Sequence, residues 1–269
     1  MTVIKDSGIE WIRKALNPYD GVCPHSCRWE LNGREAPCYV ENYRRFGQPA
    51  LNGPIRPVEN FVYKLQRDLE RMQPQPVLLS NRIDPYAPIE EVLGFTRLAI
   101  AKLIEAGWTP VILTKSTLVK RDFELIDCLG WVGMTLTSPE WARKYENASS
   151  FEERVELLKL ASKDPQYGIP TWISWEPIPP NMSVFTVASV IEEVSPDFVV
   201  FGSLNWCKKP VADYSCLAKT LYEMAESFPE VAFYFKDEII SQLSADMQAE
   251  IKARNRVPWY ESKKVEVLA

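Results

Sequence analysis

Histidine is almost absent from this chain of 269 residues, with a single copy at His25. A zinc site with several histidines is excluded, and a catalytic triad would have to use His25. The sequence contains neither a Walker loop nor G-x-G-x-x-G, so the common nucleotide-binding mechanisms lack support. No apolar run approaches the roughly 18 residues that a membrane helix needs, and no secretory signal is visible. These absences predict a cytoplasmic protein with no membrane partner.

Basic residues are also too few for a protein that binds nucleic acid by overall charge. The chain has 31 Lys+Arg against 36 Asp+Glu, a net charge of −5. A local basic groove remains compatible with this balance. Hydrophobic residues make up 46% and charged residues 25%, which is ordinary for a soluble globular protein. A chain of this length can form one α/β barrel, so we predict a single domain over 1–269.

Short apolar runs alternate with helical patterns along most of the chain. The runs predict strands, and the patterns between them, preceded by one over Phe61–Met72, predict helices. The strands are Pro76–Ser80, Pro110–Leu113, Val132–Leu136, Thr171–Trp175, Asp197–Gly202 and Val231–Phe235; the helices are Ile89–Glu105, Leu118–Leu129, Phe151–Ala161, Val184–Val194 and Ala212–Glu226. Such alternation implies parallel strands. We predict an α/β fold, a partial (β/α)6 TIM-like barrel.

Three segments flank or interrupt this repeat. They are an N-terminal cysteine-cluster loop (17–40), a flexible loop (47–57) and a C-terminal helical extension (237–269). Polar residues follow the predicted strands, at Asn81–Asp84, Thr114–Ser116, Thr137–Ser138, Glu176–Pro177 and Ser203–Trp206. In a barrel these ends meet at one face, which is where active sites form. Trp172 and Trp175 share one strand and must face opposite sides if it is regular.

Three of the six cysteines lie within 16 residues, as Cys23, Cys27 and Cys38. In a reducing compartment such a group is more typical of a metal site than of disulfides. Three thiolates can hold three irons of a [4Fe–4S] cluster and leave the fourth open. A Cys3His zinc site that includes His25 is the alternative. His25 is otherwise interpreted as a loop residue bonded to backbone, and Cys128 as a helical core residue.

Several motifs occur in order between residue 17 and about residue 177, and they are similar to those of a known family. They are Asn17-Pro18-Tyr19-Asp20-Gly21, Cys38-Tyr39, Asp84-Pro85-Tyr86-Ala87-Pro88-Ile89-Glu90, Leu113-Thr114-Lys115-Ser116 and Glu176-Pro177. With the cysteines, they resemble the radical S-adenosylmethionine (SAM) superfamily, in particular its branch similar to spore photoproduct lyase and related phage and bacterial proteins. The family usually has C-x3-C-x2-C, whereas ten residues, Arg28–Pro37, separate Cys27 from Cys38 here and would have to loop out.

The resemblance implies an enzyme with a [4Fe–4S] cluster on Cys23, Cys27 and Cys38. Reductive cleavage of SAM would give a 5′-deoxyadenosyl radical that abstracts hydrogen from a substrate. The implied SAM-binding residues are Lys115 for the carboxylate, Ser80 for the amino or carboxylate group, Thr135 or Thr137 for the ribose or carboxylate, and the Tyr39 backbone for adenine. An exposed lysine near a helix start is the alternative interpretation of Lys115.

The resemblance also implies candidate catalytic residues. Cys207 is a candidate hydrogen-atom donor, with a surface or packed thiol as the alternative. Glu176 is a candidate substrate contact, with structural pairing to Arg82 as the alternative, and we expect Asp84 and Tyr86 to face the barrel mouth. The substrate is a small molecule, a nucleotide or a nucleic-acid base, and the electron donor is a protein such as flavodoxin or ferredoxin.

Two other functions are compatible with the same residues. One is a zinc-stabilised barrel that is not an enzyme and serves as an interaction protein. The other is a barrel hydrolase or lyase in which Asp84 and Glu176 act as an acid/base pair. Metal content distinguishes the first, and activity that survives loss of the clustered cysteines distinguishes the second.

Overall fold

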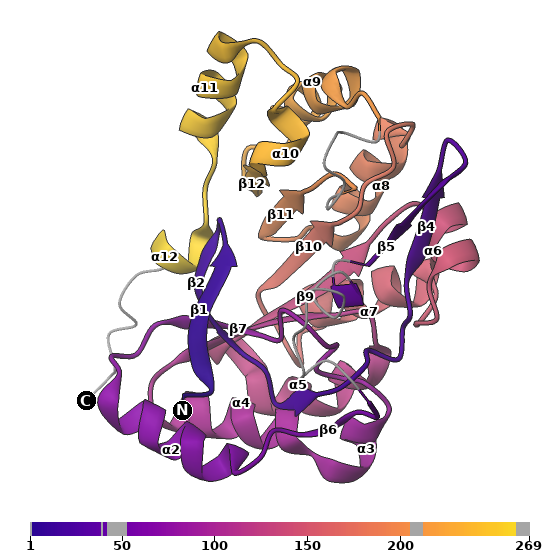
Figure 1. The fold of residues 1–269 in the computed structure, drawn as a ribbon. Coiled ribbons are helices and arrows are strands. Elements are labelled where there is room, and N and C mark those ends of the chain that lie inside the picture. Colours follow the sequence, from indigo (N-terminus) through magenta and orange to yellow (C-terminus); the bar gives the residue numbers. More distant parts are fainter. Residues whose placement is uncertain (1, 39, 42–52, 205–211, 262–269) are drawn as a thin grey trace.

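An eight-stranded sheet runs through the computed structural model and curls into a partial barrel (Figure 1). Residues 2–38, 40–41, 53–204 and 212–261 are described. The spatial order is β1 (Ile4–Ile9), β2 (Ile12–Leu16), β7 (Pro76–Leu79), β8 (Thr109–Thr114), β9 (Trp131–Leu136), β10 (Thr171–Trp175), β11 (Phe198–Phe201) and β12 (Ala232–Phe235). Neighbours from β2 to β12 are parallel, and β1 is antiparallel to β2. The predicted partial barrel is confirmed.

Most of the helices connect the strands and pack on the outer face of the sheet, whereas Trp259 of the last helix packs inside the barrel. The helices are α2 (Phe61–Arg71), α3 (Ile89–Leu93), α4 (Phe95–Glu105), α5 (Phe123–Ile126), α6 (Pro139–Tyr145), α7 (Phe151–Lys163), α8 (Val184–Val194), α9 (Ser215–Ala225), α10 (Asp237–Ile240), α11 (Ala245–Arg254) and α12 (Pro258–Glu261). As Figure 1 shows, α12 returns to the β1–β2 hairpin, where Tyr260 accepts a hydrogen bond from the Arg13 amide at 2.9 Å. Within the described residues, no helix is both long and apolar enough to span a membrane.

Two predicted helices are wrong in detail. The helix expected over Ile89–Glu105 divides into α3 and α4 because Gly94 lies in the left-handed region, with φ of 67°. The helix expected over Leu118–Leu129 consists of two 3₁₀ segments, η2 (Thr117–Asp122) and η3 (Asp127–Leu129), with α5 between them. Asp127 has a φ of 41°, which stops the α-helix there.

Several short strands were not predicted from the sequence. The β1–β2 hairpin forms one end of the sheet, and β3 (Tyr19–Asp20) pairs with β6 (Arg56–Pro57). This second pair occupies part of the segment expected to be a flexible loop (47–57), of which only residues 53–57 are described. A third pair, β4 (Arg28–Leu31) and β5 (Arg34–Pro37), forms a hairpin between Cys27 and Cys38.

Strand residues alternate between two cores. Trp175 packs outward against the helices, whereas Trp172 packs inside the barrel, as expected for residues three apart. Inside, Trp172 donates its indole N–H to the Ile112 carbonyl at 2.9 Å. It belongs to an aromatic cluster with edge-to-face or tilted rings, made of Trp11, Trp131, Trp172, Phe198 and Trp259. Aromatic residues therefore fill the barrel near the amino ends of the strands, and polar residues follow toward the carboxyl ends of the same strands.

The fit around Trp172 depends on a glycine in the neighbouring strand. A Cβ at Gly133 would come within 2.2 Å of the indole ring. We predict that Gly133→Ala lowers the free energy of unfolding by about 1–3 kcal/mol, because the ring has no free space to move into. Urea denaturation measures this loss. The control is Val92→Ile, which adds one carbon at an exposed side chain, 83% accessible. Equal stability of the two variants would contradict the packing described.

Candidate functional site

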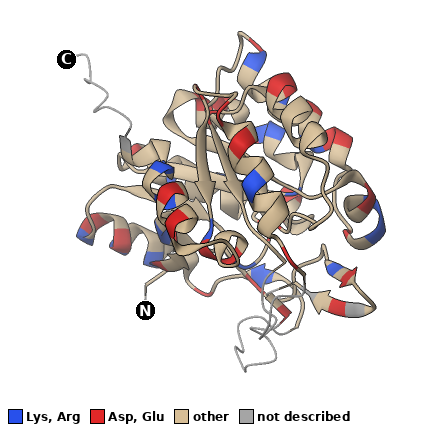
Figure 2. Cartoon of the chain, turned by 90° about the horizontal axis from the view of Figure 1, so that it is seen from above, with Lys and Arg blue, Asp and Glu red and all other residues tan. Residues whose placement is uncertain are grey.

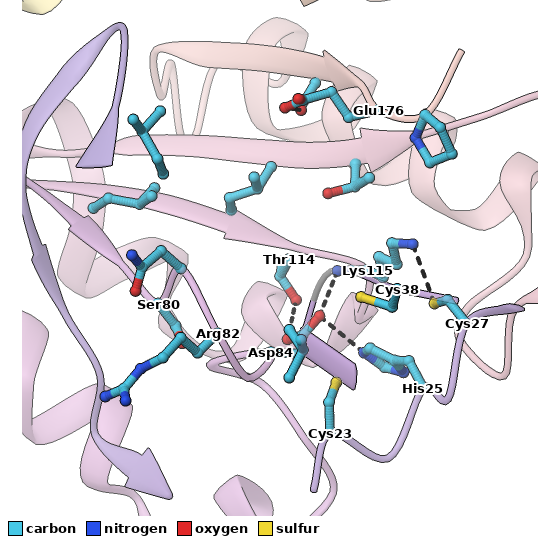
Figure 3. A pocket seen from close by; sticks show the side chains of 18 of the residues that line it. Cys23, His25, Cys27, Cys38, Ser80, Arg82, Asp84, Thr114, Lys115 and Glu176 are labelled. Atoms are coloured by element: carbon cyan, nitrogen blue, oxygen red, sulfur yellow. Dashed lines mark hydrogen bonds and ion pairs between the residues drawn. The ribbon is translucent and has the colours of Figure 1, made fainter. Parts of the chain in front are cut away.

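A cavity of about 330 Å³ lies at the carboxyl ends of the strands. Its walls come from the cysteine-cluster loop, from the ends of β7 to β12 and from the β1–β2 hairpin. Figure 3 shows Cys23, Cys27 and Cys38 gathered on one side of this cavity, with Glu176 on the opposite wall. Active sites of barrel proteins form at this edge, so the position agrees with the predicted site.

The β4–β5 hairpin accommodates the unusual spacing of the cysteines. Arg28 pairs with Pro37 at the base of the hairpin, so the residues just outside it are neighbours. There the Cys38 amide donates a hydrogen bond to the Cys27 carbonyl at 3.1 Å. The turn at the far end is Asn32-Gly33, with φ of 53° and 70°. All ten residues between Cys27 and Cys38 therefore form the hairpin, and Cys38 returns beside Cys27.

Cys27 is buried, Cys23 and Cys38 are half-buried, and Cys27 lies close enough to raise the pKa of the other two thiols. Burial raises the pKa of Cys23 to about 11 and that of Cys38 to about 12. The nearby Cys27 and Cys23 raise the pKa of Cys38 further. Burial also raises the pKa of Cys27, although Lys115 opposes this. Among the described residues, no three His, Cys, Asp or Glu side chains are arranged to hold a single metal ion.

Asp84 holds the cysteine-cluster loop against the barrel. Its carboxylate accepts hydrogen bonds from His25 Nε2 at 2.9 Å, Thr114 Oγ1 at 2.6 Å, the Lys115 amide at 2.7 Å and the Tyr86 amide at 2.8 Å. Burial would raise the pKa of Asp84, but the hydrogen bond and charge of His25 outweigh it and leave the pKa lowered. Asp84 has an ordering role in this arrangement, and its hydrogen bond from the Tyr86 amide forms an Asx turn.

His25 is interpreted correctly as a loop residue bonded to backbone. Its Nδ1 lies 2.8 Å from the Asn147 carbonyl, and Nε2 faces Asp84. Both ring nitrogens are therefore engaged in hydrogen bonds. Burial would lower the pKa of His25, but Asp84 and the Asn147 carbonyl raise it overall. This arrangement leaves no ring nitrogen available as a fourth ligand of a Cys3His zinc site.

Two of the sequence motifs hold neighbouring loops together through residues that do not line the cavity. Tyr19 donates its hydroxyl to Glu90 at 2.5 Å, which joins the Asn-Pro-Tyr motif to the Asp-Pro-Tyr motif. A Cβ at Gly21 would lie 2.6 Å from the Pro54 carbonyl, and its φ is 116°, so this position needs glycine. Tyr86 was expected at the barrel mouth, but it is fully buried and donates to Asp122 at 3.0 Å. The expectation for Tyr86 is wrong because its hydroxyl is hydrogen-bonded to the Asp122 carboxylate inside the protein.

Lys115 lies beside the cysteines and is not exposed. Its ammonium is 3.4 Å from Cys27 Sγ, 5.2 Å from the centre of the Trp29 ring and in a short contact with Glu146. Glu146 also accepts from Arg154 at 2.6 Å. Burial would lower the pKa of Lys115, but Glu146 and Cys27 outweigh it and raise the pKa. Lys115 therefore stays charged at the cavity wall, and the alternative of an exposed lysine is wrong.

The hydroxyl candidates for SAM binding fall into two groups. Ser80 and Thr135 line the cavity, and Thr137 does not. Thr135 lies two residues after Gly133 on β9, so its side chain points to the same inner face of the barrel. Thr137 is fully buried, and its hydroxyl donates to the Pro177 carbonyl at 2.8 Å. Ser80 has a φ of 69°, and its hydroxyl lies within hydrogen-bond distance of two acceptors, Asn17 Oδ1 at 2.9 Å and the Ile83 carbonyl. This geometry favours Thr135 over Thr137 as a ligand-binding residue.

Glu176 lines the cavity but does not pair with Arg82. Its two carboxylate oxygens accept from Ser174 at 2.8 Å and from Lys236 at 2.6 Å. Arg82 is instead 3.9 Å from Asp20. The suggested Glu176–Arg82 pair is therefore wrong, because the end of β12 brings a lysine closer. Lys236 has a second carboxylate partner, Glu238, at 2.9 Å.

The predictions for Tyr39 and for the cysteines outside the cluster have different outcomes. Tyr39 and Cys207 lie outside the described residues. Cys128 was expected in a helical core, but it is exposed in η3, because the chain there is a surface 3₁₀ turn. Cys216 is also an exposed free thiol. Both lie away from the cavity lining, which makes them useful controls.

Comparison with solved structures finds the same fold in known enzymes. No family model matches the chain, and no curated protein sequence matches it significantly. A spore photoproduct lyase complexed with dinucleoside spore photoproduct is 16% identical, with a TM-score of 0.62 over 87% of this chain and 80% of that one. A lyase variant with bound AdoMet and the same dinucleoside has a TM-score of 0.61, 16% identity and the same coverages.

A third solved structure extends the likeness beyond the lyase. SuiB of Streptococcus suis bound to S-adenosylmethionine is 11% identical, with a TM-score of 0.50, and the match covers 82% of this chain and 49% of that one. At these identities the likeness establishes the fold.

Glu146 is predicted to be important for the stability of this site. Glu146→Gln leaves Lys115 and Arg154 with no buried anion between them, so we expect the free energy of unfolding to fall by about 3 kcal/mol. Urea denaturation measures the change. Glu140→Gln, at an exposed position of α6, is the control and should change stability by less than about 0.5 kcal/mol. Similar small losses in both variants would refute the account of this buried network.

Proposed function

We propose that this chain is a radical SAM enzyme. Its [4Fe–4S] cluster would reductively cleave S-adenosylmethionine and so supply a 5′-deoxyadenosyl radical that removes hydrogen from a substrate. The observation that carries the proposal is the gathering of Cys23, Cys27 and Cys38 at the carboxyl edge of a partial barrel, around one cavity. A fold shared with spore photoproduct lyase and SuiB supports it.

The cysteines fit an iron–sulfur cluster better than a single metal ion. Burial raises the pKa of all three thiols, and Cys27 raises the pKa of Cys23 and Cys38 further, which favours a cationic group that would stabilise the thiolate forms. A single zinc ion needs four donors at about 2.0–2.3 Å, and the described side chains do not converge in that way. A four-iron cluster distributes its ligands over separate irons, so it tolerates wider spacing. The protein would contribute ligands, shielding and orientation.

Three side chains of the cavity wall are the proposed contacts of SAM. Lys115 would face the carboxylate with its ammonium, which Glu146 keeps charged and in place. Ser80 and Thr135 would offer hydroxyl groups from the ends of β7 and β9. The Tyr39 backbone as an adenine contact and Cys207 as a hydrogen-atom donor remain predictions. Thr137 is not retained, because it does not line the cavity and its hydroxyl is bound to the Pro177 carbonyl.

The partners follow from the proposed chemistry. A low-potential protein such as flavodoxin or ferredoxin would supply the electron, and a reducing compartment such as the cytoplasm would protect the thiols. The substrate would be a small molecule or a nucleotide. Long nucleic acid is less favoured, because Figure 2 shows acidic and basic residues interspersed along the helices and the net charge is −5.

The other two functions have less support. A Cys3His zinc site would have to break the bonds of His25 to Asp84 and Asn147. An acid/base pair of Asp84 and Glu176 would need free carboxylates, yet Asp84 accepts four hydrogen bonds and Glu176 is paired with Lys236. Neither arrangement favours proton transfer to a substrate.

The cluster assignment makes a direct prediction for cysteine variants. After anaerobic reconstitution, Cys23→Ala, Cys27→Ala and Cys38→Ala should each retain less than about a tenth of the wild-type iron and sulfide, because a cluster with two protein ligands is not held. Cys128→Ala and Cys216→Ala are the matched controls and should retain all of it. Iron and sulfide analysis measures the outcome. Full iron and sulfide in Cys38→Ala would contradict its role as a ligand across the hairpin.

The SAM contacts make a second prediction, which compares Thr135 in β9 with Thr137 just after its end. Thr135→Val removes a hydroxyl from the cavity wall, so we expect the Kd for SAM to rise roughly fivefold with little loss of stability. Thr137→Val breaks the bond to Pro177, and we expect it to lower the free energy of unfolding by about 1 kcal/mol without changing that Kd. Anaerobic equilibrium binding and urea denaturation separate the two effects. Unchanged SAM affinity in Thr135→Val would remove Thr135 from the site.

A further inference from the structure

The cavity has a second end that the cluster and SAM do not use. Across from the cysteines, its lining includes Glu10 of the β1–β2 turn, Glu176, Lys236 and Glu238 (Figure 3 labels Glu176 on this wall). Three carboxylates therefore share this end with one ammonium group. Apolar side chains of Leu78 and Leu113 also line the cavity. A substrate that reaches SAM from this side would meet these charges.

Glu176 is held in a fixed orientation by its surroundings. Ser174 Oγ donates to Oε2 at 2.8 Å, and Lys236 Nζ donates to Oε1 at 2.6 Å. On the third side, a Cβ at Gly202 would lie 2.4 Å from Oε1, so only glycine leaves room for the carboxylate. Two strand ends and a missing side chain thus position one acidic group on the cavity wall. Such support from neighbouring residues is expected of a group that recognises a ligand.

Lys236 does not neutralise this end of the cavity. Its ammonium is shared between Glu176 at 2.6 Å and Glu238 at 2.9 Å. Glu10 accepts hydrogen bonds from the Asp237 amide at 3.2 Å and the Tyr234 hydroxyl at 3.4 Å, neither of which carries a positive charge. Burial raises the pKa of Glu10, and the nearby Glu238 adds to this. An anionic ligand would face repulsion here, whereas a cationic one would relieve it.

We propose that Glu176 determines substrate specificity and that the substrate presents a cationic nitrogen group, an amine or a guanidine, to this end of the cavity. The inference rests on the proposed function for the meaning of "substrate", but cation binding itself can be measured without turnover. The proposal disfavours a phosphate-bearing nucleotide at this end of the cavity, since its phosphate would meet three carboxylates. Lys236 is the protein's own cation at the Glu176 carboxylate, and a cationic ligand would compete with it for that group.

The test uses the full chain, reconstituted anaerobically, with agmatine as the cationic probe and adenosine monophosphate as the anionic one. We expect agmatine to saturate the protein at millimolar concentration. Glu176→Gln should weaken this binding at least about tenfold, because a charged hydrogen bond is lost while the shape is kept. Lys236→Met should strengthen it, because it leaves the three carboxylates without their own cation. Glu156→Gln, at an exposed position of α7, is the control and should change nothing.

The opposite directions of the two variants separate recognition from structural support. A merely structural role would weaken agmatine binding in both Glu176→Gln and Lys236→Met, and that result would overturn the inference. Absence of agmatine binding, or tighter binding of adenosine monophosphate, would also overturn it. Iron and sulfide are measured in the same samples. A protein that binds agmatine as described but assembles no cluster would refute the proposed function and leave this cation site standing.

Discussion

The candidate site depends on one buried carboxylate, Asp84. It accepts hydrogen bonds from the cysteine-cluster loop through His25, from the end of β8 through Thr114 and the Lys115 amide, and from its own turn through the Tyr86 amide. Burial alone would favour the neutral acid, but His25, Thr114 and the Lys115 amide hold the pKa of Asp84 below its ordinary value. An ionised carboxylate at this point fixes the loop that carries the cysteines to the strand that carries Lys115.

The remaining motif residues extend this anchoring away from the cavity. Tyr19 and Glu90 connect the segment before the cysteines to α3, and Arg121 donates to the same Glu90 carboxylate at 2.7 Å. Glu146 and Arg154 likewise anchor Lys115. Glu146 contacts the Lys115 ammonium and accepts a hydrogen bond from Arg154. Most of the sequence pattern that resembles the radical SAM superfamily therefore positions loops and does not line the cavity. Chemistry is left to the cysteines and to a few side chains at the strand ends.

Much of the fold could be predicted from the sequence because the central strands are continuous apolar runs. The opposite orientation of Trp172 and Trp175 follows from the alternation of a regular strand alone. The β1–β2 hairpin could not be found in this way, since its strands mix charged and apolar residues such as Lys5 and Lys14. The β4–β5 hairpin had a usable signal, the Asn32-Gly33 turn, which is typical of two-residue hairpin loops.

The candidate site was only partly predictable for a different reason. Cys23, Cys27 and Cys38 are close in sequence, and their spacing indicated a metal site. The partners that decide what the other groups do come from distant segments. Lys115 meets Glu146, and Glu176 meets Lys236, 60 residues later. No local pattern predicts such pairs, because they depend on how the barrel closes. Trp29 and Arg154 were missed for the same reason.

The most direct measurement is low-temperature electron paramagnetic resonance of the anaerobically reconstituted, dithionite-reduced protein, with and without S-adenosylmethionine. If the three cysteines hold a cluster with one open iron at this cavity, a reduced [4Fe–4S] signal will be present and will change shape when S-adenosylmethionine is added. A cluster signal that S-adenosylmethionine leaves unchanged would contradict the account. So would a protein that carries zinc and no sulfide after strictly anaerobic handling.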